Sequence, residues 1–219
     1  MAIITEGVNG PVTGRLGNVV FYQVKGQNRA RSLPRVTRRK RKPSPEQAMQ
    51  RAKFKLMQEW LKPMRGLVRI GFGHYAPPKT GHNVAMSYNM KHAIVENNDQ
   101  FSVDPEAFCF SAGPLTSPVN PRVSLGEDAL HFTWEKPGID ARLGNARTLL
   151  LAYNTTESLA YYEVCGAGAH SCSGELSLRF LGYREGTVCH AYMAFMNVET
   201  GEVSDSVYAG RIVFENGPV

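Results

Sequence analysis

Hydrophobic residues follow a short alternating pattern through the second half of the chain. Beyond Phe101 they form runs separated by Gly, Pro, Asn and Asp: AFCFSAG (107–113), PRVSLGE (121–127), ALHFTWE (129–135), ARTLLLAYN (146–154), LAYYEVC (159–165), ELSLRFL (175–181), TVCHAYMAFMN (187–197) and SVYAGRIVF (206–214). Seven or eight strands in about 110 residues are typical of an immunoglobulin-like or fibronectin-type sandwich. We therefore predict a β-sandwich over residues 101–219, with Trp134 and the run Tyr192–Phe195 in its core.

A helical period precedes these strands. Ser44 is a good N-cap, Pro45 suits the first helical position, and Gln47 completes a capping-box spacing, so we predict a helix from Pro45 to Lys62. Its apolar stripe is Met49, Ala52, Leu56, Met57, Trp60 and Leu61. A helical turn or two is expected over 64–70, and a second amphipathic helix over 80–95 with Val84, Tyr88, His92 and Val95 on one stripe.

The first third of the chain begins with a glycine-punctuated hairpin. Two extended segments, 18–24 and 29–33, flank a turn centred on Gly26, which is a β-hairpin signature. Both faces of the first segment are largely apolar, and we expect Phe21 and Tyr22 to pack the hairpin, with stacking on nucleic-acid bases as the alternative. Because a lone hairpin is only marginally stable in water, this one should pack on another part of the chain or on another molecule.

These elements predict an α+β protein in three parts. Residues 1–43 form a glycine-rich hairpin and basic arm, residues 44–100 a helical segment, and residues 101–219 the immunoglobulin- or fibronectin-III-like sandwich. The boundary before the sandwich is expected near residues 98–106, where the hydrophobic period changes.

Charge divides the chain more sharply than its net value of +6 suggests. Residues 1–100 hold 18 Lys and Arg against 5 Asp and Glu, a balance of +13, whereas residues 101–219 hold 7 against 14, a balance of −7. The run RVTRRKRKP (35–43) is too charged to fold by itself and indicates an arm with an anionic partner. The candidate anion-binding residues are Arg29, Arg31, Arg35, Arg38, Arg39, Lys40, Arg41, Lys42, Arg51 and Lys55.

Three readings of this basic arm stay open. It binds nucleic acid through phosphates without reading sequence, since no recognition helix, RRM signature or zinc-finger spacing accompanies it. Alternatively it docks on an acidic protein surface, such as the second half of a neighbouring copy, in a homo-oligomer or larger assembly. The third reading is a solvated charge run.

Catalytic and metal-binding motifs are absent from the sequence. There is no phosphate loop, HExxH, GxSxG or Rossmann fingerprint, and the six histidines are scattered. The spacing of Cys109, Cys165, Cys172 and Cys189 matches no zinc site. Cys109 and Cys189 lie in apolar runs and should be buried, whereas a disulfide between Cys165 and Cys172 would need an oxidising compartment. We expect no enzyme activity, cofactor or metal.

Targeting signals are also missing from the sequence. No run approaches the roughly 18 apolar residues of a membrane span, and the start MAIITEGVNG lacks the layout of a signal peptide. The expected location is cytoplasmic or particle-associated.

Several segments, in this order, resemble an uncharacterised bacterial domain-of-unknown-function family. They are GRLGNVVFYQVKGQNRARSLP, SPEQAMQRAKF, IGF, AMSYNMKHAI and SDSVYAGRIVF, and together they extend over nearly the whole chain. The N-terminal pattern also looks like segments of phage-type structural proteins. The resemblance implies no activity and no functional residue, because no established function is known for that family.

Together these features predict a structural or assembly protein without enzyme activity, held in a larger, phage-like particle through its basic arm. The alternative function is a protein- or glycan-binding adhesive module. Its binding residues would lie in the sandwich loops, around GIDARLGN (138–145) and CGAGAHSCSG (165–174).

Overall fold

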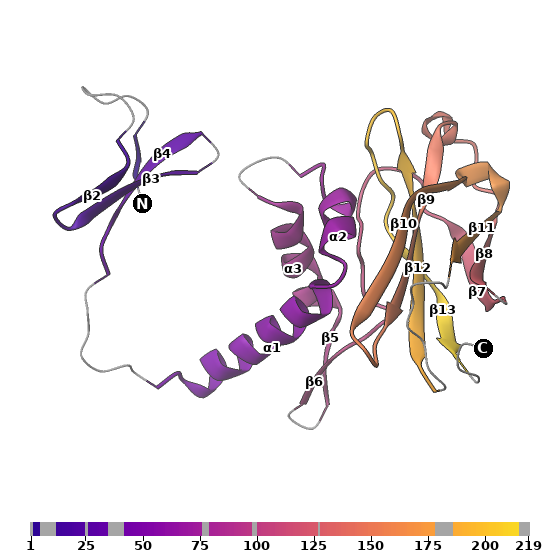
Figure 1. The fold of residues 1–219 in the computed structure, drawn as a ribbon, viewed down its shortest axis with the longest axis horizontal. Helices are drawn as coiled ribbons and strands as arrows, with labels where there is room; N and C mark the ends of the chain where they lie inside the picture. The colour runs from indigo at the N-terminus through magenta and orange to yellow at the C-terminus, as the bar shows by residue number, and fades with distance from the viewer. Residues whose placement is uncertain are drawn as a thin grey trace. The chain divides into compact units, whose positions relative to one another are not determined.

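A computed structural model describes residues 2–4, 12–24, 26–34, 42–75, 79–97, 100–126, 128–177 and 186–214. The chain divides into two compact units, an N-terminal unit, Met1–Ser44, and a C-terminal unit, Pro45–Val219. Antiparallel sheets contain more of the described residues than the α-helices do, so the protein is α+β (Figure 1). Among the described helices, none is long and apolar enough to cross a membrane.

The N-terminal unit is a four-stranded antiparallel sheet. Its strand order is β1-β4-β3-β2, with bounds β1 Ala2–Ile4, β2 Gly14–Leu16, β3 Val19–Val24 and β4 Gln27–Ser32. The predicted hairpin is confirmed as β3–β4, and Gly26 occupies the left-handed region at φ +76° that its tight turn requires. The outer strands β1 and β2 were not predicted, because three-residue strands leave almost no periodic signal.

Three helices open the C-terminal unit: α1 Pro45–Leu61, α2 Arg65–Gly71 and α3 Gly81–His92. The prediction of α1 is confirmed. Its predicted apolar stripe is buried only in the C-terminal half, where Met57 and Leu61 are fully buried, while Met49 remains 42% exposed. The first turns of α1 therefore have no core to pack against within the described part of this unit.

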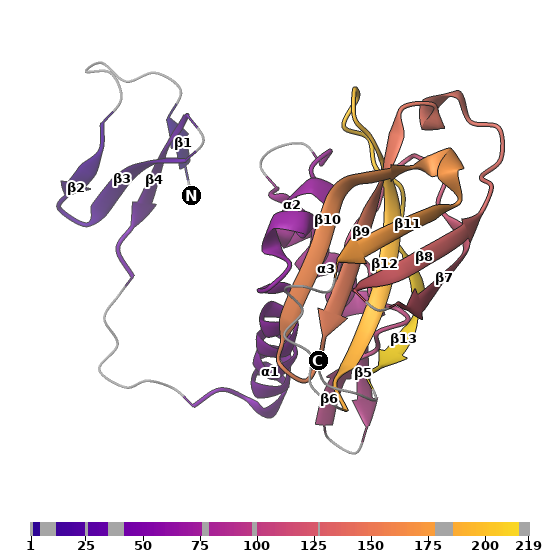
Figure 2. The ribbon, with the colours of Figure 1, turned by 45° about the vertical axis from the view of Figure 1, so that its right-hand side comes forward.

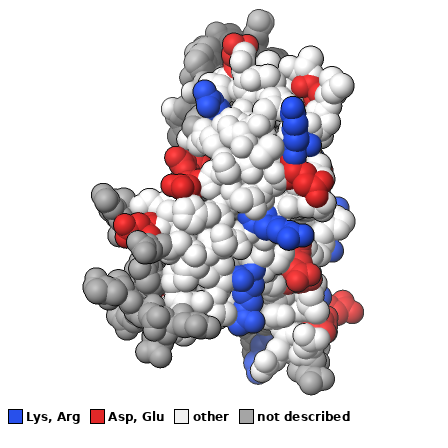
Figure 3. All heavy atoms as spheres, turned by 90° about the vertical axis from the view of Figure 1, so that its right-hand side faces the viewer, with Lys and Arg blue, Asp and Glu red and all other residues white. Residues whose placement is uncertain are grey.

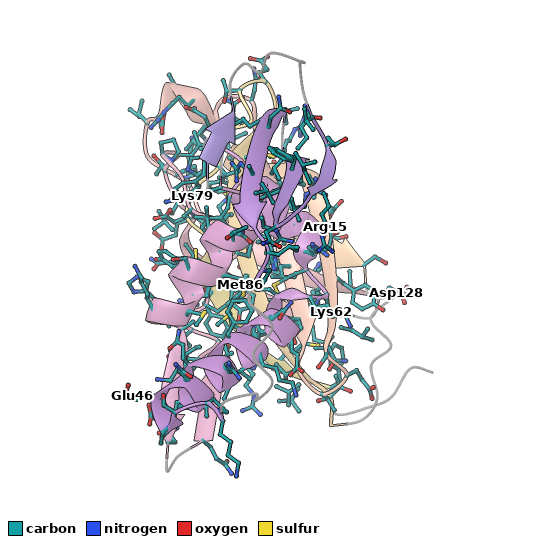
Figure 4. All side chains as sticks on the ribbon, turned by 90° about the vertical axis from the view of Figure 1, so that its left-hand side faces the viewer. Arg15, Glu46, Lys62, Lys79, Met86 and Asp128 are labelled. Atoms are coloured by element: carbon teal, nitrogen blue, oxygen red, sulfur yellow. The ribbon has the colours of Figure 1, made fainter. Side chains whose placement is uncertain are left out.

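The predicted stripe of α3 is wrong. Tyr88 and Val95 are exposed, and the buried residues are Ala85, Met86 and Asn89. Asn89 faces the core because its side chain donates to the carbonyls of Ala85 and Cys109 and accepts from the Cys109 amide, at 2.7–3.0 Å. The helix ends at His92, since the residues from Ile94 onward pair as a strand with residues 100–103. Met86 points inward from α3 (Figure 4).

The remaining strands of the C-terminal unit are β5 Ile94–Asn97, β6 Gln100–Val103, β7 Val119–Leu125, β8 Ala129–Glu135, β9 Ala146–Asn154, β10 Leu159–Gly168, β11 Ser173–Ser177, β12 Val188–Asn197 and β13 Val207–Val213. β5 and β6 form a hairpin, β7, β8 and β11 form a three-stranded sheet in the order β11-β8-β7, and the rest form a four-stranded sheet in the order β10-β9-β12-β13. Seven of the predicted runs thus correspond to strands β7 to β13.

Layers cover both faces of the four-stranded sheet (Figures 1 and 2). On one face, Leu151 and Tyr192 join a hydrophobic cluster with residues of α1, α2 and α3. On the other, Leu150 and Phe195 join a second cluster with Phe132 and other residues of the three-stranded sheet. Burial on both sides explains why β9 is apolar along almost its whole length rather than alternating.

A buried connector, residues 107–115, links the helices to the sheets, and the strand predicted over 107–113 is wrong. Phe108 and Phe110 are buried, but their surroundings satisfy the backbone without a ladder. Ser206 Oγ accepts from the Phe110 amide, the Gly71 carbonyl accepts from Ala112, and the Asp205 carboxylate accepts from Gly113. Core clusters therefore continue across the expected boundary at residues 98–106, with Ala93 and Phe108 in the same cluster.

Predictions for the core residues hold. Trp134 is 5% exposed, donates from Nε1 to the Ala169 carbonyl at 2.8 Å, and makes an edge contact with Phe195. Cys109 and Cys189 are both buried. The thiol of Cys172 is free, and the other side chain of the disulfide that the sequence left open, Cys165, lies outside the described side chains.

Candidate anion-binding surfaces

The predicted basic site is described only in part. Arg29, Arg31, Lys42, Arg51 and Lys55 are described, and the structure distributes them over both units. The remaining predicted residues lie outside the described residues: Arg35, Arg38, Arg39, Lys40 and Arg41.

Strand register gathers three arginines on one face of the N-terminal sheet. Val20 of β3 pairs with Arg15 of β2 on one side and with Arg31 of β4 on the other. Directly paired residues point to the same face, and so do residues two apart on one strand, which adds Arg29 and Tyr22. We call this surface, formed by Arg15, Tyr22, Arg29 and Arg31, the cationic face; Arg15 is labelled in Figure 4.

Contacts within the cationic face orient its arginines. The Arg31 guanidinium lies 5.7 Å from the centre of the Tyr22 ring, a cation–π geometry. Arg15 Nε donates to the Gly17 carbonyl at 3.0 Å, and Arg29 donates to the Gln27 amide oxygen at 3.1 Å. Within the described part of the chain, Arg15 and Arg31 form no ion pair with a carboxylate. Their charge is therefore available to an external anion.

We call the opposite face of this sheet the apolar face, after Leu16, Val19, Phe21 and Ala30. By the same alternation it also carries the polar residues Gln23, Asn28 and Ser32, and Leu16 is 73% exposed. None of the side chains described in the N-terminal unit is buried. A sheet in a stable domain buries one face, but the side chains described in this unit form no such core.

Arg51 and Lys55 lie four residues apart on the exposed side of α1. Arg51 lines a shallow hollow with Gln47, Gln50 and Phe54. Lys55 lies 3.8 Å from Glu59 and is exposed, so this ion pair is weak. The two residues thus share one side of the helix but line different hollows.

Lys55 is part of a cluster that the sequence did not reveal. A pocket of about 480 Å³ is formed by Lys55, Gln58, Glu59, Lys62, Arg65 and His82, and we call it the cationic pocket. Its residues come from α1, from Lys62 directly after α1, from the start of α2 and from the first turn of α3. Lys62 is labelled in Figure 4. Only the packing of the three helices brings Arg65 and His82 together, so no local spacing predicts the pocket.

His82 has an unusual environment in this pocket. Its Nδ1 is buried and has no hydrogen-bond partner among the described residues. Burial, and then the nearby Arg65 charge, lowers the pKa of the His82 imidazole below its ordinary value. The ring is therefore neutral near pH 7. Lys55, Lys62 and Arg65 supply the positive charge of the pocket, and Glu59 is the one acidic residue in its lining.

Acidic residues gather in another hollow of the C-terminal unit. A groove of about 760 Å³ runs between β10 and β11, the edge strands of the two sheets. Its lining residues are Asp128, Ala129, Tyr161, Tyr162, Glu163, Val164, Glu175, Leu176 and Ser177, and we call it the acidic groove. Elsewhere the charges mix: Figure 3 shows Lys and Arg interspersed with Asp and Glu on the face that carries the three-stranded sheet.

Two further candidate groups are held in structural roles. Asp140 lies in the predicted recognition loop 138–145 and accepts hydrogen bonds from the Thr116 hydroxyl and from the Arg142 side chain. The hydrogen bonds from Arg142 strongly lower the pKa of the Asp140 carboxyl. Burial raises the pKa of the Cys109 thiol and raises that of Cys189 to about 12, so both remain protonated. Within the described residues, no group of three His, Cys, Asp or Glu is arranged to hold a metal.

Comparison with protein-family models matches residues 11–210 to a family of unknown function, DUF6266. The chain belongs to DUF6266. This confirms the resemblance inferred from the glycine hairpin and the helical motifs. The cationic face, the cationic pocket and the acidic groove all lie within the DUF6266 match. A comparison with curated proteins found no match.

Proposed function

We propose that the protein is a non-enzymatic assembly protein whose N-terminal unit binds nucleic acid through phosphate contacts, in a larger, phage-like particle. The cationic face is the observation that carries the proposal. It displays Arg15, Arg29 and Arg31 in a unit that holds ten Lys and Arg against one acidic residue, Glu6. The basic run 35–42 continues the same charge along the chain.

The spacing of these arginines suits a polyanion better than a single small anion. Arg29 and Arg31 are two residues apart on one strand, about 6.7 Å between Cα atoms, and Arg15 lies two strands from Arg31, about 9.6 Å away. Each guanidinium therefore contacts a separate phosphate. Tyr22 lies between them and offers a ring for base stacking, whereas Phe21 points to the apolar face.

The test is binding of a labelled oligonucleotide, followed by fluorescence anisotropy between about 50 and 200 mM salt. Each phosphate contact contributes about 0.9 to the slope of log K against log salt, so Arg29→Gln with Arg31→Gln should lower the slope by about 2. Arg122→Gln with Lys136→Gln removes the same charge from exposed positions of the C-terminal unit and is the matched control.

Neutralising residues 38–42 should reduce binding further. If that variant and the Arg29/Arg31 variant both bind the oligonucleotide like the unmodified chain, nucleic-acid binding by the N-terminal unit is wrong.

A second candidate partner is a neighbouring copy of this chain, because the acidic groove complements the basic arm. Asp128, Glu163 and Glu175 line this groove, and Glu175 Oε1 lies 3.2 Å from His131 Nδ1. The groove lies between two edge strands, where an extended segment adds by strand pairing. Leu16, Val19 and Phe21 on the apolar face of the N-terminal sheet also suit burial against another subunit.

The molar mass measured by light scattering distinguishes between the two candidate partners. Self-assembly predicts a mass that rises with protein concentration and falls in Glu163→Gln with Glu175→Gln, but not in the control Glu46→Gln with Glu157→Gln. If the mass is monomeric at every protein concentration and rises by a defined amount when an oligonucleotide is added, nucleic acid is the partner. The same result excludes a neighbouring copy as the partner.

We also propose that residues 119–213 form a fibronectin-III-like sandwich. In chain order, the three-stranded sheet takes the first, second and fifth of the seven strands, and the four-stranded sheet takes the third, fourth, sixth and seventh. This division corresponds to strands A, B and E opposite C′, C, F and G of immunoglobulin-like folds. A crystal structure in which β11 pairs with β10 instead of β8 would contradict it.

A further inference from the structure

We propose that the cationic pocket of the C-terminal unit binds a phosphate group of a small molecule or of a nucleic-acid end. This site lies in a different unit from the cationic face, and the proposal does not depend on nucleic-acid binding by that face. Its lining residues come from three helices of one compact unit. The pocket therefore exists whatever the N-terminal unit binds.

The charges of the pocket fit a phosphate monoester. Lys55, Lys62 and Arg65 oppose a single carboxylate, Glu59, which leaves a balance of +2 while His82 is neutral. A phosphate monoester carries nearly two negative charges near pH 7, whereas a carboxylate carries one. Arg65 offers a planar fork for two phosphate oxygens, and the lysines add point charges.

Burial at His82 adds an argument of a different kind. A buried polar atom without a partner costs free energy, and such atoms in native structures often mark the place of a ligand. Nδ1 of His82 is such an atom, and the ring lies in the first turn of α3, at the helix end that favours anions. The ring lines the pocket, so a phosphate bound there would lie beside it.

The volume of the pocket indicates that the phosphate belongs to a larger molecule. About 480 Å³ falls within the range of about 300–1,000 Å³ typical of small-molecule sites, and it exceeds what a free phosphate fills. The lining is polar, with Gln58 and Glu59 beside the cations, so the rest of the ligand should be polar as well.

The experiment is an NMR titration of the full chain with inorganic phosphate at constant ionic strength, observing the His82 ring. We expect a saturable shift with a Kd of about 1 mM or tighter. The pKa of His82 should rise on binding, because the dianion opposes the effects of burial and of Arg65. The charged groups around the ring that set this change are Lys55, Glu59, Lys62 and Arg65.

Arg65→Gln should weaken phosphate binding at least about tenfold. Arg69→Gln is the matched control, because Arg69 is also exposed on α2 but does not line the pocket. Amide spectra of both variants confirm that the fold is retained. A shift that does not saturate, or that is equal in Arg65→Gln and Arg69→Gln, overturns the proposal.

Oligonucleotides with and without a 5′-phosphate distinguish the two sources of phosphate, in a variant whose residues 38–42 are neutral. A stronger His82 response to the phosphorylated strand assigns the pocket to a nucleic-acid end. Equal responses, with inorganic phosphate still bound, assign it to a small phosphorylated molecule.

Discussion

Both units of this protein contain strands with alternating apolar residues, but the two units bury these residues differently. In the N-terminal unit, Phe21 and Val19 alternate correctly along a strand, yet no described side chain there is buried. In the C-terminal unit, two hydrophobic clusters occupy both sides of one sheet and include fully buried residues such as Tyr192 and Phe195. Hydrophobic alternation predicts a strand, therefore, but not whether the strand has a core.

Charge separates the same two units. The N-terminal unit holds ten Lys and Arg with Glu6 as its acid, and the remaining fifteen basic and eighteen acidic residues belong to the C-terminal unit. A unit with little buried area and a high charge gains stability from a bound partner, whereas the C-terminal unit gains it from its own packing.

The largest effect is expected when one phenylalanine is truncated in each unit. Phe195→Ala should cost about 3–5 kcal/mol of unfolding free energy, because a buried ring leaves a cavity between the sheets. Phe21→Ala should cost less than about 1 kcal/mol, because its ring is partly exposed. Urea denaturation measures both, and equal costs would remove the distinction between the units.

Asn89 tests whether the helices and sheets of the C-terminal unit share one core. Asn89→Ala should cost about 2–3 kcal/mol, because the buried backbone groups of Cys109 lose their partners. The control Asn83→Ala removes an exposed side chain of the same helix and should cost a few tenths of a kcal/mol. Thermal unfolding should also remain a single transition in Asn89→Ala; separate transitions for helices and sheets would show two cores.

Hydrogen exchange compares the units directly. Amides of β3 and β4 should exchange at least about a hundredfold faster than those of β9 and β12, since local opening of the small sheet exposes no core. An oligonucleotide at ten times its Kd should slow exchange in the N-terminal sheet about tenfold and leave β9 unchanged. Slowing confined to the C-terminal unit would place the nucleic-acid site there instead.

The smallest effect is a pH dependence confined to the C-terminal unit, which contains all six histidines. Burial, and then Arg211, lowers the pKa of His190, whose Nδ1 lies 3.0 Å from the Tyr208 hydroxyl. Because the unfolded chain binds this proton more readily, stability should fall as pH drops below about 6.5, the ordinary value for histidine, towards the lowered value. His190→Gln should make the urea midpoint less sensitive to pH in that window, while an unchanged profile would exclude His190 as its source.

Sequence patterns predicted the elements that depend on local signals. The capping residues before Pro45 marked the start of α1, and β8 and β9 coincide with the predicted runs residue for residue. The errors lie where tertiary contacts replace local ones. Residues 107–113 resemble a strand, but side chains from distant segments satisfy their backbone, and the buried polar Asn89 rotated α3 away from its predicted stripe.

The candidate sites divide in the same way. The arginines of the cationic face were predictable, because charge composition and a hairpin signal are local. The cationic pocket was not, because Lys55 and His82 are 27 positions apart and meet only after the helices pack. The acidic groove likewise depends on which strands become sheet edges.

The buried connector also has a mechanical consequence for the C-terminal unit. Its backbone bonds to Gly71 on the helical side and to the segment around Val203 on the sheet side, and Gly71 and Gly113 each leave no room for a β-carbon at these crossings. The helices therefore cannot slide over the sheet without breaking this join. A force that a bound N-terminal unit applies to α1 would therefore pass through the connector into the four-stranded sheet and would not separate the helices from it.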